Sequence, residues 1–210
     1  VSISRFFHFP RSETAGSAGP VDCTEAAEEL HRLLRDSVRL RLRSDVPLGC
    51  YLSGGLDSST VSCLAAQTSD TPVTVFTAAF PEGGIYDETP YARAVVRRCG
   101  LRARELQPDP DGFWQELPRV LYHLDQPFEG PQIHPKFAVS RLAAEHVTVC
   151  LGGQGGDEVC VGYPRYLLAF LENRLVQPFR SPDWMHALGA WRNLAPCRSR
   201  LRFLTQLADA

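Results

Sequence analysis

Two glycine-rich loops that carry acidic residues are the part of this sequence best suited to chemistry. The first extends from Ser53 to Ser59 and reads Ser-Gly-Gly-Leu-Asp-Ser-Ser, with Asp57 as its acid. The second extends from Gly152 to Glu158 and reads Gly-Gly-Gln-Gly-Gly-Asp-Glu, with Asp157 and Glu158 at its end. Glycines let a backbone approach an anion closely, and the free N–H groups at the start of a helix attract phosphate. The two loops therefore predict a phosphate site.

Asp57 decides what kind of phosphate site the first loop predicts. The loop lacks the G-x-x-x-x-G-K-[ST] pattern of the Walker loop and contains no lysine. A carboxylate would repel phosphate unless a divalent cation bridged the two, so Asp57 implies Mg²⁺. The hydroxyls of Ser53, Ser58 and Ser59 add hydrogen-bond donors. The alternative interpretation is a glycine turn in which Asp57 only caps a helix.

Asp157 repeats this logic in the second loop. Because each loop follows a predicted strand, Asp57 and Asp157 are expected at the same sheet edge, where they could share one Mg²⁺. Such a site would hold the phosphates of ATP and neutralise departing pyrophosphate. By itself the second loop could be only a tight turn, and its pairing with the first loop is what indicates nucleotide chemistry.

Alternating strands and helices are expected to position the two loops. Apolar and β-branched runs predict strands at 48–52, 73–80, 103–107 and 147–151. Apolar periodicity and capping residues predict helices at 22–42, 58–67, 87–99, 111–123, 135–145 and 166–175. Strands that alternate with helices favour right-handed crossovers. We therefore expect an α/β fold, a doubly wound parallel sheet with helices on both faces.

The composition argues against several other classes of protein. The 210 residues carry a net charge of -2 and a pI near 6.3, which offers no basic surface for nucleic acid or an anionic membrane. No apolar run reaches the roughly 18 residues of a membrane span, and no signal peptide is visible, so we expect a cytoplasmic protein. The seven cysteines form no C-x-x-C pair. Reduced cysteines in a protein core are therefore favoured over a disulfide framework or a metal site.

Several motifs together resemble the synthetase domain of the glutamine-dependent asparagine synthetases. They are Val46-Pro47-Leu48-Gly49 leading into Leu52–Ser59, Tyr86-Asp87-Glu88, His123-Leu124-Asp125-Gln126-Pro127, and Gly155-Gly156-Asp157-Glu158 followed by Gly162-Tyr163. Their order and spacing agree over residues 24–166, and Arg5-Phe6-Phe7 resembles the aromatic linker that follows the family's glutaminase domain. The resemblance implies an ATP-pyrophosphatase domain of the PP-loop type, with an adenine nucleotide alpha hydrolase-like fold.

The resemblance also implies a role for each loop. ATP would bind with its pyrophosphate at Ser53, Gly54, Gly55, Asp57, Ser58 and Ser59, and its adenine would lie against backbone at Leu52, Ala78, Gly152 and Gly153. Mg²⁺ would be held by Asp57 and Asp157, and the catalytic residues would be Asp57, Asp157, Glu158 and Gln154. The side-chain carboxylate of aspartate would attack the α-phosphorus, giving an acyl adenylate and pyrophosphate. Ammonia from a glutaminase domain would then displace AMP and give asparagine.

Gln154 departs from the family pattern, because asparagine producers usually carry Glu at this position of G-E-G-x-D-E. A neutral amide cannot act as a base toward an incoming amine. Cys160-Val161 also replaces the usual Phe-Gly/Ala. Two alternatives therefore stay open. One is a related amide former, such as a β-lactam synthetase or a lasso-peptide cyclase, and the other is a non-catalytic nucleotide-binding module.

The expected domain organisation is that of a fragment. Residues 1–21 are expected to be a linker from a missing N-terminal glutaminase domain, and residues 22–175 the ATP-pyrophosphatase synthetase domain. Residues 176–210 would then begin a truncated helical C-terminal region. The expected partners are ATP, a small carboxylate (aspartate in the simplest case) and glutamine-derived ammonia. A homodimer is left open.

Other residues have weaker claims to function. Asp87 and Glu88 could be only a helix start, and Asp125 could be only part of a turn. The histidines at positions 123, 134 and 146 share no metal-ligand spacing. Lys136 is the only lysine, so a catalytic lysine would have to be Lys136 or lie outside this chain.

Overall fold

The computed structural model describes residues 4, 22–80, 83, 87–127, 130–169, 171 and 172. The chain divides into two compact units, residues 1–153 and 154–210, and each is described by itself. The expected linker at 1–21 lies outside the described residues except for position 4, as do the expected C-terminal region at 176–210 and Tyr86.

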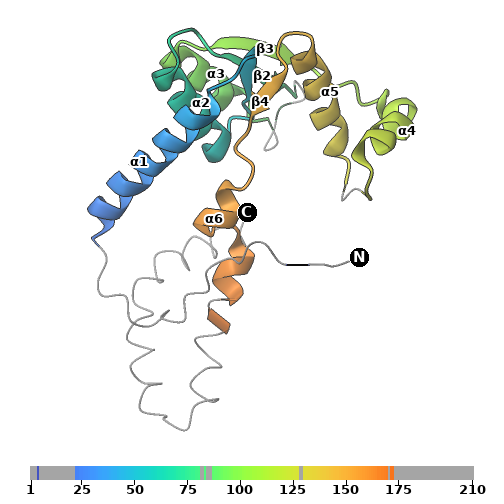
Figure 1. Ribbon diagram of the computed structural model, residues 1–210. Coiled ribbons are helices and arrows are strands. Elements are labelled where there is room, and N and C mark those ends of the chain that lie inside the picture. The colour runs from blue at the N-terminus through green and yellow to red at the C-terminus, as the bar shows by residue number, and fades with distance from the viewer. Residues whose placement is uncertain are drawn as a thin grey trace. The chain divides into compact units, whose positions relative to one another are not determined.

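A four-stranded parallel sheet forms the centre of the first unit (Figure 1). Its strands are β1 (Leu48–Tyr51), β2 (Thr74–Ala78), β3 (Arg102–Leu106) and β4 (Val149–Leu151), in the order β3-β2-β1-β4. Cys50 of β1 is in register with Val75 on one side and with Leu151 on the other. The expected parallel sheet is therefore confirmed, with each strand boundary within about two residues of its predicted position.

The helices of the first unit alternate with the strands as the sequence predicts, whereas α6 of the second unit begins where the sequence predicts a loop. Those of the first unit are α1 (Cys23–Arg41), α2 (Leu56–Thr68), α3 (Thr89–Cys99), α4 (Phe113–Leu124) and α5 (Ile133–Ala144). In the second unit α6 is Gly156–Cys160, and residues 164–169 are also helical. Local capping explains two of the boundaries. Asp22 accepts a hydrogen bond from the Thr24 N–H at 2.7 Å and so begins α1, and Gly100 ends α3 at a φ of 65°.

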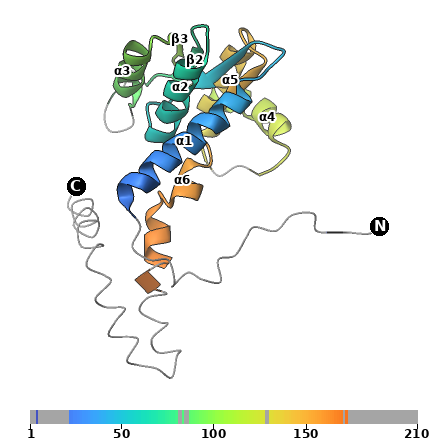
Figure 2. The ribbon, with the colours of Figure 1, turned by 60° about the vertical axis from the view of Figure 1, so that its left-hand side comes forward.

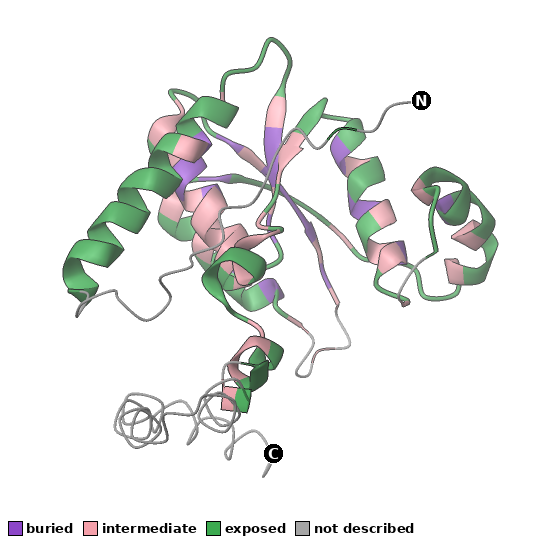
Figure 3. Cartoon of the chain, turned by 60° about the horizontal axis from the view of Figure 1, so that its bottom comes forward, coloured by how far each residue is buried: buried purple, intermediate pink, exposed green. Residues whose placement is uncertain are grey.

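Each face of the sheet is covered by helices, because successive residues of a strand point to opposite faces. Cys50 and Val75 belong to a buried cluster that includes residues of α1, α2 and α3. Tyr51 and Phe76, one residue further along, belong to a second cluster with Val139 and Ala143 of α5. Figures 2 and 3 show the two helical layers and the buried residues concentrated on the strands between them. The doubly wound arrangement is confirmed.

The order of the strands creates a switch point between β1 and β4. The chain runs outward from β1 through β2 to β3, then returns to add β4 on the other side of β1. In open parallel sheets of this kind, ligands bind beyond the carboxyl ends of the two strands at which the direction reverses. Both glycine-rich loops leave the sheet at these ends, the first after β1 and the second after β4.

Helix α1 is less buried than its apolar spacing predicts. Val38 is its buried residue, whereas Leu30 and Leu34 are 46% and 37% exposed. Only the C-terminal part of the helix therefore contributes to the core. None of the helices that the structure describes has the length and apolar character to cross a membrane.

Glu116 of α4 connects this helix to α5 through two side-chain contacts. Its carboxylate accepts a hydrogen bond from Arg141 at 2.5 Å, and its other oxygen lies 2.9 Å from Nε2 of the buried His134. The hydrogen bond from Arg141, together with the weaker effect of His134, lowers the pKa of Glu116 despite a partial opposing effect of burial. The carboxylate is therefore stabilised in its charged form in the folded protein.

We predict that Glu116→Gln lowers the free energy of unfolding at neutral pH by about 1.5–3 kcal/mol, the usual contribution of a hydrogen bond to a charged group. Because the folded-state pKa is depressed, this stabilisation is present above the unfolded pKa of about 4.3 and is lost as the pH falls through the lower folded value. Urea unfolding of both proteins at a series of acidic pH values measures the difference.

Glu29→Gln is the matched control, since Glu29 pairs with Arg32 at an exposed site on α1 and its loss should change stability little. A difference for Glu116→Gln that stays constant down to the lowest pH would contradict the assigned role of its charge.

Candidate functional site

The first loop is held together by hydrogen bonds among its own residues. The Ser53 N–H donates to Oγ of Ser58 at 3.2 Å, and the Gly55 N–H donates to Oγ of Ser53 at 3.2 Å. The two hydroxyl oxygens are 2.9 Å apart, and Ser58 also donates to the carbonyl of Gly55 at 3.2 Å. Ser53 and Ser58 thus stabilise the turn itself. This is a role beyond the donation to a ligand that the sequence suggests.

Gly54 has a backbone conformation and a position that exclude a side chain. Its φ is 101°, which residues with a Cβ rarely adopt. A Cβ at this position would lie 2.5 Å from the carbonyl oxygen of Glu88 and 3.0 Å from the backbone nitrogen of Ala92. The backbone of the first loop is therefore in direct contact with the backbone at the start of α3.

The start of α2 presents free N–H groups next to this turn. Gly55 is the N-cap residue and has no side chain to cap the helix, and the first intrahelical bond here is from the Ser59 N–H to the Gly55 carbonyl. The N–H groups of Leu56, Asp57 and Ser58 are therefore without intrahelical acceptors. Asp57 lies in this first turn and is half-buried. The site combines donors for an anion with a carboxylate for a cation.

Gly153 brings the second loop against the same turn of α2. A Cβ on Gly153 would lie 2.5 Å from the backbone nitrogen of Ser58 and 2.6 Å from the carbonyl carbon of Asp57. Only a glycine backbone fits this space. The expected convergence of the two loops at the sheet edge is therefore seen in the first unit, up to Gly153.

The backbone of Leu52 is occupied by hydrogen bonds within the sheet. Its N–H donates to the Phe76 carbonyl at 3.0 Å, and its carbonyl accepts the buried Thr77 hydroxyl at 2.7 Å. Leu52 is 1% exposed, whereas Ala78 at the end of β2 is half-buried. Leu52 therefore offers an adenine ring neither open surface nor a free N–H, so its predicted contact with adenine stays a prediction.

Asp157 and Glu158 lie in the first turn of α6, in the second unit. Glu158 accepts a hydrogen bond from the Tyr163 hydroxyl at 3.0 Å, which is the largest cause of the raised pKa of Tyr163. Gly162 follows closely on Asp157, since its N–H donates to the Asp157 carbonyl at 2.8 Å. The guanidinium of Arg165 lies 4.3 Å from the centre of the Tyr163 ring. Gln154 is exposed.

The shared Mg²⁺ site stays a prediction, because Asp57 and Asp157 belong to different units. Within the described ranges no group of three or more His, Cys, Asp or Glu is placed to hold a metal ion. The residues nevertheless fit the kind of ion proposed. Mg²⁺ is commonly held by one or two carboxylates together with the phosphates of a nucleotide, so a cluster of three protein ligands is not needed.

Glu88 lies closer to the first loop than the sequence indicates. The sequence predicts a possible helix start there, and Glu88 is the N-cap residue of α3, without a side-chain capping bond. Its Oε2 also lies only 3.8 Å from the position of a Cβ on Gly55, beside the first loop. The motif Tyr86-Asp87-Glu88 was the signal that could have placed it there. Asp87 accepts the Thr89 N–H at 3.0 Å and has a local capping role.

The weaker candidates have structural roles. Asp125 ends α4 with a φ of 52°. His123 stacks on Phe137, and His146 stacks on Phe76. None of these contacts is part of the loop site.

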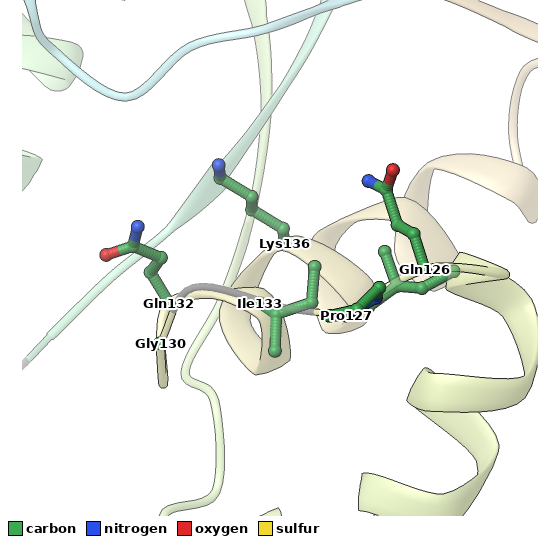
Figure 4. A pocket seen from close by; sticks show the side chains of 7 residues that line it. Gln126, Pro127, Gly130, Gln132, Ile133 and Lys136 are labelled. Atoms are coloured by element: carbon green, nitrogen blue, oxygen red, sulfur yellow. The ribbon is translucent and has the colours of Figure 1, made fainter.

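A separate pocket of about 310 Å³ lies in the first unit, where α4 leads into α5. Lys136 and the amides of Gln126 and Gln132 are its polar lining (Figure 4), and the remainder is formed by Leu124, Pro127, Gly130 and Ile133. Since α5 crosses back over the sheet to begin β4, its start lies toward the carboxyl ends of the strands. One cation and two amides suit a polar or anionic ligand.

Comparison with known proteins gives a consistent result. The family model described as asparagine synthase matches residues 29–209. A putative glutamine-hydrolyzing asparagine synthetase 2 from Methanocaldococcus jannaschii is 39% identical over 147 residues, covering 70% of this chain and 28% of that protein. The glutamine-hydrolyzing asparagine synthetase 1 of Bacillus subtilis is 34% identical over 139 residues, covering 66% and 22%. The chain thus spans about a quarter of the length of these relatives.

A solved structure, the NH3-dependent NAD synthetase from Campylobacter jejuni, covers 69% of this chain and 62% of its own at 14% identity. Its TM-score of 0.41 is too low to add to the comparison with the sequence relatives.

The close approach at Gly54 leads to a test of the loop geometry. Gly54→Ala should lower the free energy of unfolding by about 3 kcal/mol or more, since it combines an unfavourable positive φ with a collision against backbone. Gly100→Ala has the same sign of φ but open space around it, and should cost only about 1–2 kcal/mol. Urea unfolding compares the two variants. Equal costs would show that Gly54 is not in contact with α3.

Proposed function

Because this chain belongs to the asparagine synthase family, whose model matches residues 29–209, we propose that it binds ATP with Mg²⁺ and activates a carboxylate for amide formation. The observation that carries the proposal is the approach of Gly153 to the first turn of α2, directly after the Gly54-Gly55 turn. Gly55, the N-cap residue, and Gly153 both leave the N–H groups at the start of this 13-residue helix without a neighbouring side chain of their own. A phosphate chain is the ligand that such a backbone-lined site suits best.

The residues of the first loop divide the work of holding the nucleotide. The N–H groups at the start of α2 donate to phosphate oxygens, and the Ser53–Ser58 hydrogen bonds keep the loop in the conformation that exposes them. Asp57 supplies a carboxylate on the same turn. Mg²⁺ bound there would neutralise charge on the departing pyrophosphate.

The proposed reaction has two steps. An oxygen of the substrate carboxylate attacks the α-phosphorus of ATP, the bond to the β-phosphate oxygen breaks, and an acyl adenylate and pyrophosphate form. Ammonia or another amine then attacks the acyl carbon and displaces AMP. Adenylation is needed because a carboxylate oxygen is a poor leaving group, whereas AMP is a good one. We propose aspartate as the carboxylate and glutamine-derived ammonia as the amine, supplied by a glutaminase domain of a longer protein.

Gln154 favours keeping an amide other than asparagine as an alternative product. In the second step the attacking amine must lose a proton, and an exposed amide cannot accept it. Glu158, four residues on, carries a carboxylate, but it is already hydrogen-bonded to Tyr163. The alternative is therefore that a different amine attacks the acyl adenylate, as in β-lactam synthetases or lasso-peptide cyclases.

A non-catalytic nucleotide-binding module is the alternative from another class. The retention of Asp57, Asp157 and both glycine-rich loops favours an enzyme. A location in the cytoplasm and a homodimer remain expectations.

The negative charge of Asp57 should affect ATP binding in opposite directions with and without Mg²⁺, which provides a test of the site. With Mg²⁺ present, Asp57→Asn should weaken ATP binding by about tenfold or more, because a cation ligand is removed. With EDTA present instead, the variant should bind ATP as well as or better than the wild type, because a charge that repels phosphate is gone. Isothermal titration of the 210-residue chain measures both affinities.

Asp70→Asn is the matched control, an exposed Asp-to-Asn change beyond the far end of α2, and should leave both affinities unchanged. Failure of the folded wild type to bind ATP would overturn the nucleotide site. If Asp57→Asn weakened ATP binding equally with and without Mg²⁺, Asp57 would not be a ligand of the metal.

Exchange of pyrophosphate into ATP tests the substrate. In a chain extended to the full length of the relatives, exchange should depend on aspartate among a panel of carboxylates, and Asp57→Asn should abolish it. Gln154→Glu should leave exchange unchanged and raise the rate of amide formation from ammonia by about 10²-fold, the usual contribution of a general base. Exchange with another carboxylate would support the alternative amide formers, and ATP binding without any exchange would support the non-catalytic module.

A further inference from the structure

Two cysteines from different helices have their sulfur atoms in contact. Cys63 lies in the middle of α2 and Cys99 is the last residue of α3, and their Sγ atoms are 2.8 Å apart. A disulfide bond is about 2.05 Å long, so closing one requires the sulfur atoms to approach by about 0.8 Å. The sequence separation of 36 residues gives no hint of this pair.

The surroundings of the pair give an oxidant access to the sulfur atoms but make the thiols react slowly. Both cysteines are half-buried, so a small reagent can reach them, whereas Cys50 is fully buried. Burial, followed by the hydrogen bond with Cys99, raises the pKa of Cys63 to about 11, despite an opposing effect of Arg98. A thiol with such a pKa is protonated at neutral pH and attacks oxidants slowly. Oxidation of the pair is therefore expected to be slow.

A bond between these cysteines would join two helices that both begin at the first loop. Helix α2 starts directly after Gly55, and α3 starts at Glu88, whose carbonyl lies against Gly54. The two helices also pack into one buried cluster, which includes Leu64 of α2 and Ala92 of α3. Movement of α3 away from α2 would open the space around Gly54. A covalent link between the helices would oppose that movement.

We propose that Cys63 and Cys99 form a reversible disulfide that ties α2 to α3 and holds the first loop in place. With oxidised glutathione as the oxidant, the thiolate of one cysteine attacks a glutathione sulfur and releases one reduced glutathione. The second cysteine then attacks the mixed disulfide, forming the Cys63–Cys99 bond and releasing the other. Two electrons pass from the cysteine pair to the glutathione disulfide, and the two thiol protons end on the two released glutathione thiols.

Peptide mapping under non-reducing conditions tests the bond. After equilibration of the 210-residue chain with excess oxidised glutathione, the exposed Cys23 and Cys160 should carry glutathione, whereas Cys63 and Cys99 together should lose only two hydrogen atoms. Digestion should yield the Cys63 peptide linked to the Cys99 peptide, and dithiothreitol should reverse the change. Cys63→Ser and Cys99→Ser should both prevent the link, and Cys160→Ser, an exposed cysteine of the second unit, should not. Stable glutathione adducts on Cys63 or Cys99 in place of the link would overturn the proposal.

Hydrogen exchange tests the coupling to the loop without any nucleotide. Amide exchange at residues 53–59 should be several-fold slower in the oxidised than in the reduced wild type, since opening of the α2–α3 contact is opposed. Cys99→Ser treated with the same oxidant should show no slowing. Unchanged exchange in a protein that carries the mapped disulfide would overturn the link between the cysteine pair and the loop.

Discussion

Direct packing of backbone on backbone around the start of α2 is the constraint on which the rest of the structure depends. The second loop lies against the first turn of α2, and the first loop lies against the start of α3, with glycine at both points of contact. A side chain at Gly54 would meet Glu88, and one at Gly153 would meet Asp57 and Ser58. The serines of the first loop accept the N–H groups of Ser53 and Gly55, and the N–H groups at the start of α2 stay available for the phosphate that we propose.

The strand order of the sheet allows the two loops to meet at the start of α2. The return of the chain from β3 to β4 places the ends of β1 and β4 next to one another, so two segments almost 100 residues apart reach the same helix start. Phe76 and Cys50, on opposite faces, anchor the helical layers that hold the strands in place. The rigidity of the site therefore depends on the core and on the contact between α2 and α3.

Patterns that depend on neighbouring residues could be predicted from the sequence. The strand of β-branched residues at β2, the capping of α1 by Asp22 and the glycine that ends α3 are all local. The two glycine-rich loops and their convergence follow from alternation of strands and helices together with the edge rule for parallel sheets. What could not be predicted depends on distance in space. The contact of Glu88 with Gly54, the Cys63–Cys99 pair and the exposure of Leu30 are set by how helices lie on one another, which no local pattern encodes.

The hydrogen bonds at Leu52 bear on selectivity for the base. The N–H of this residue is bound to Phe76, and its carbonyl already accepts the Thr77 hydroxyl in the core. Since Leu52 is also 1% exposed, it offers a purine neither open surface nor a free donor. Under the proposed function, the distinction between adenine and guanine would fall to other backbone, such as that of Ala78 or Gly152. A change at Ala78 would leave the contact between the two loops intact, whereas a side chain at Gly153 would collide with Asp57 and Ser58.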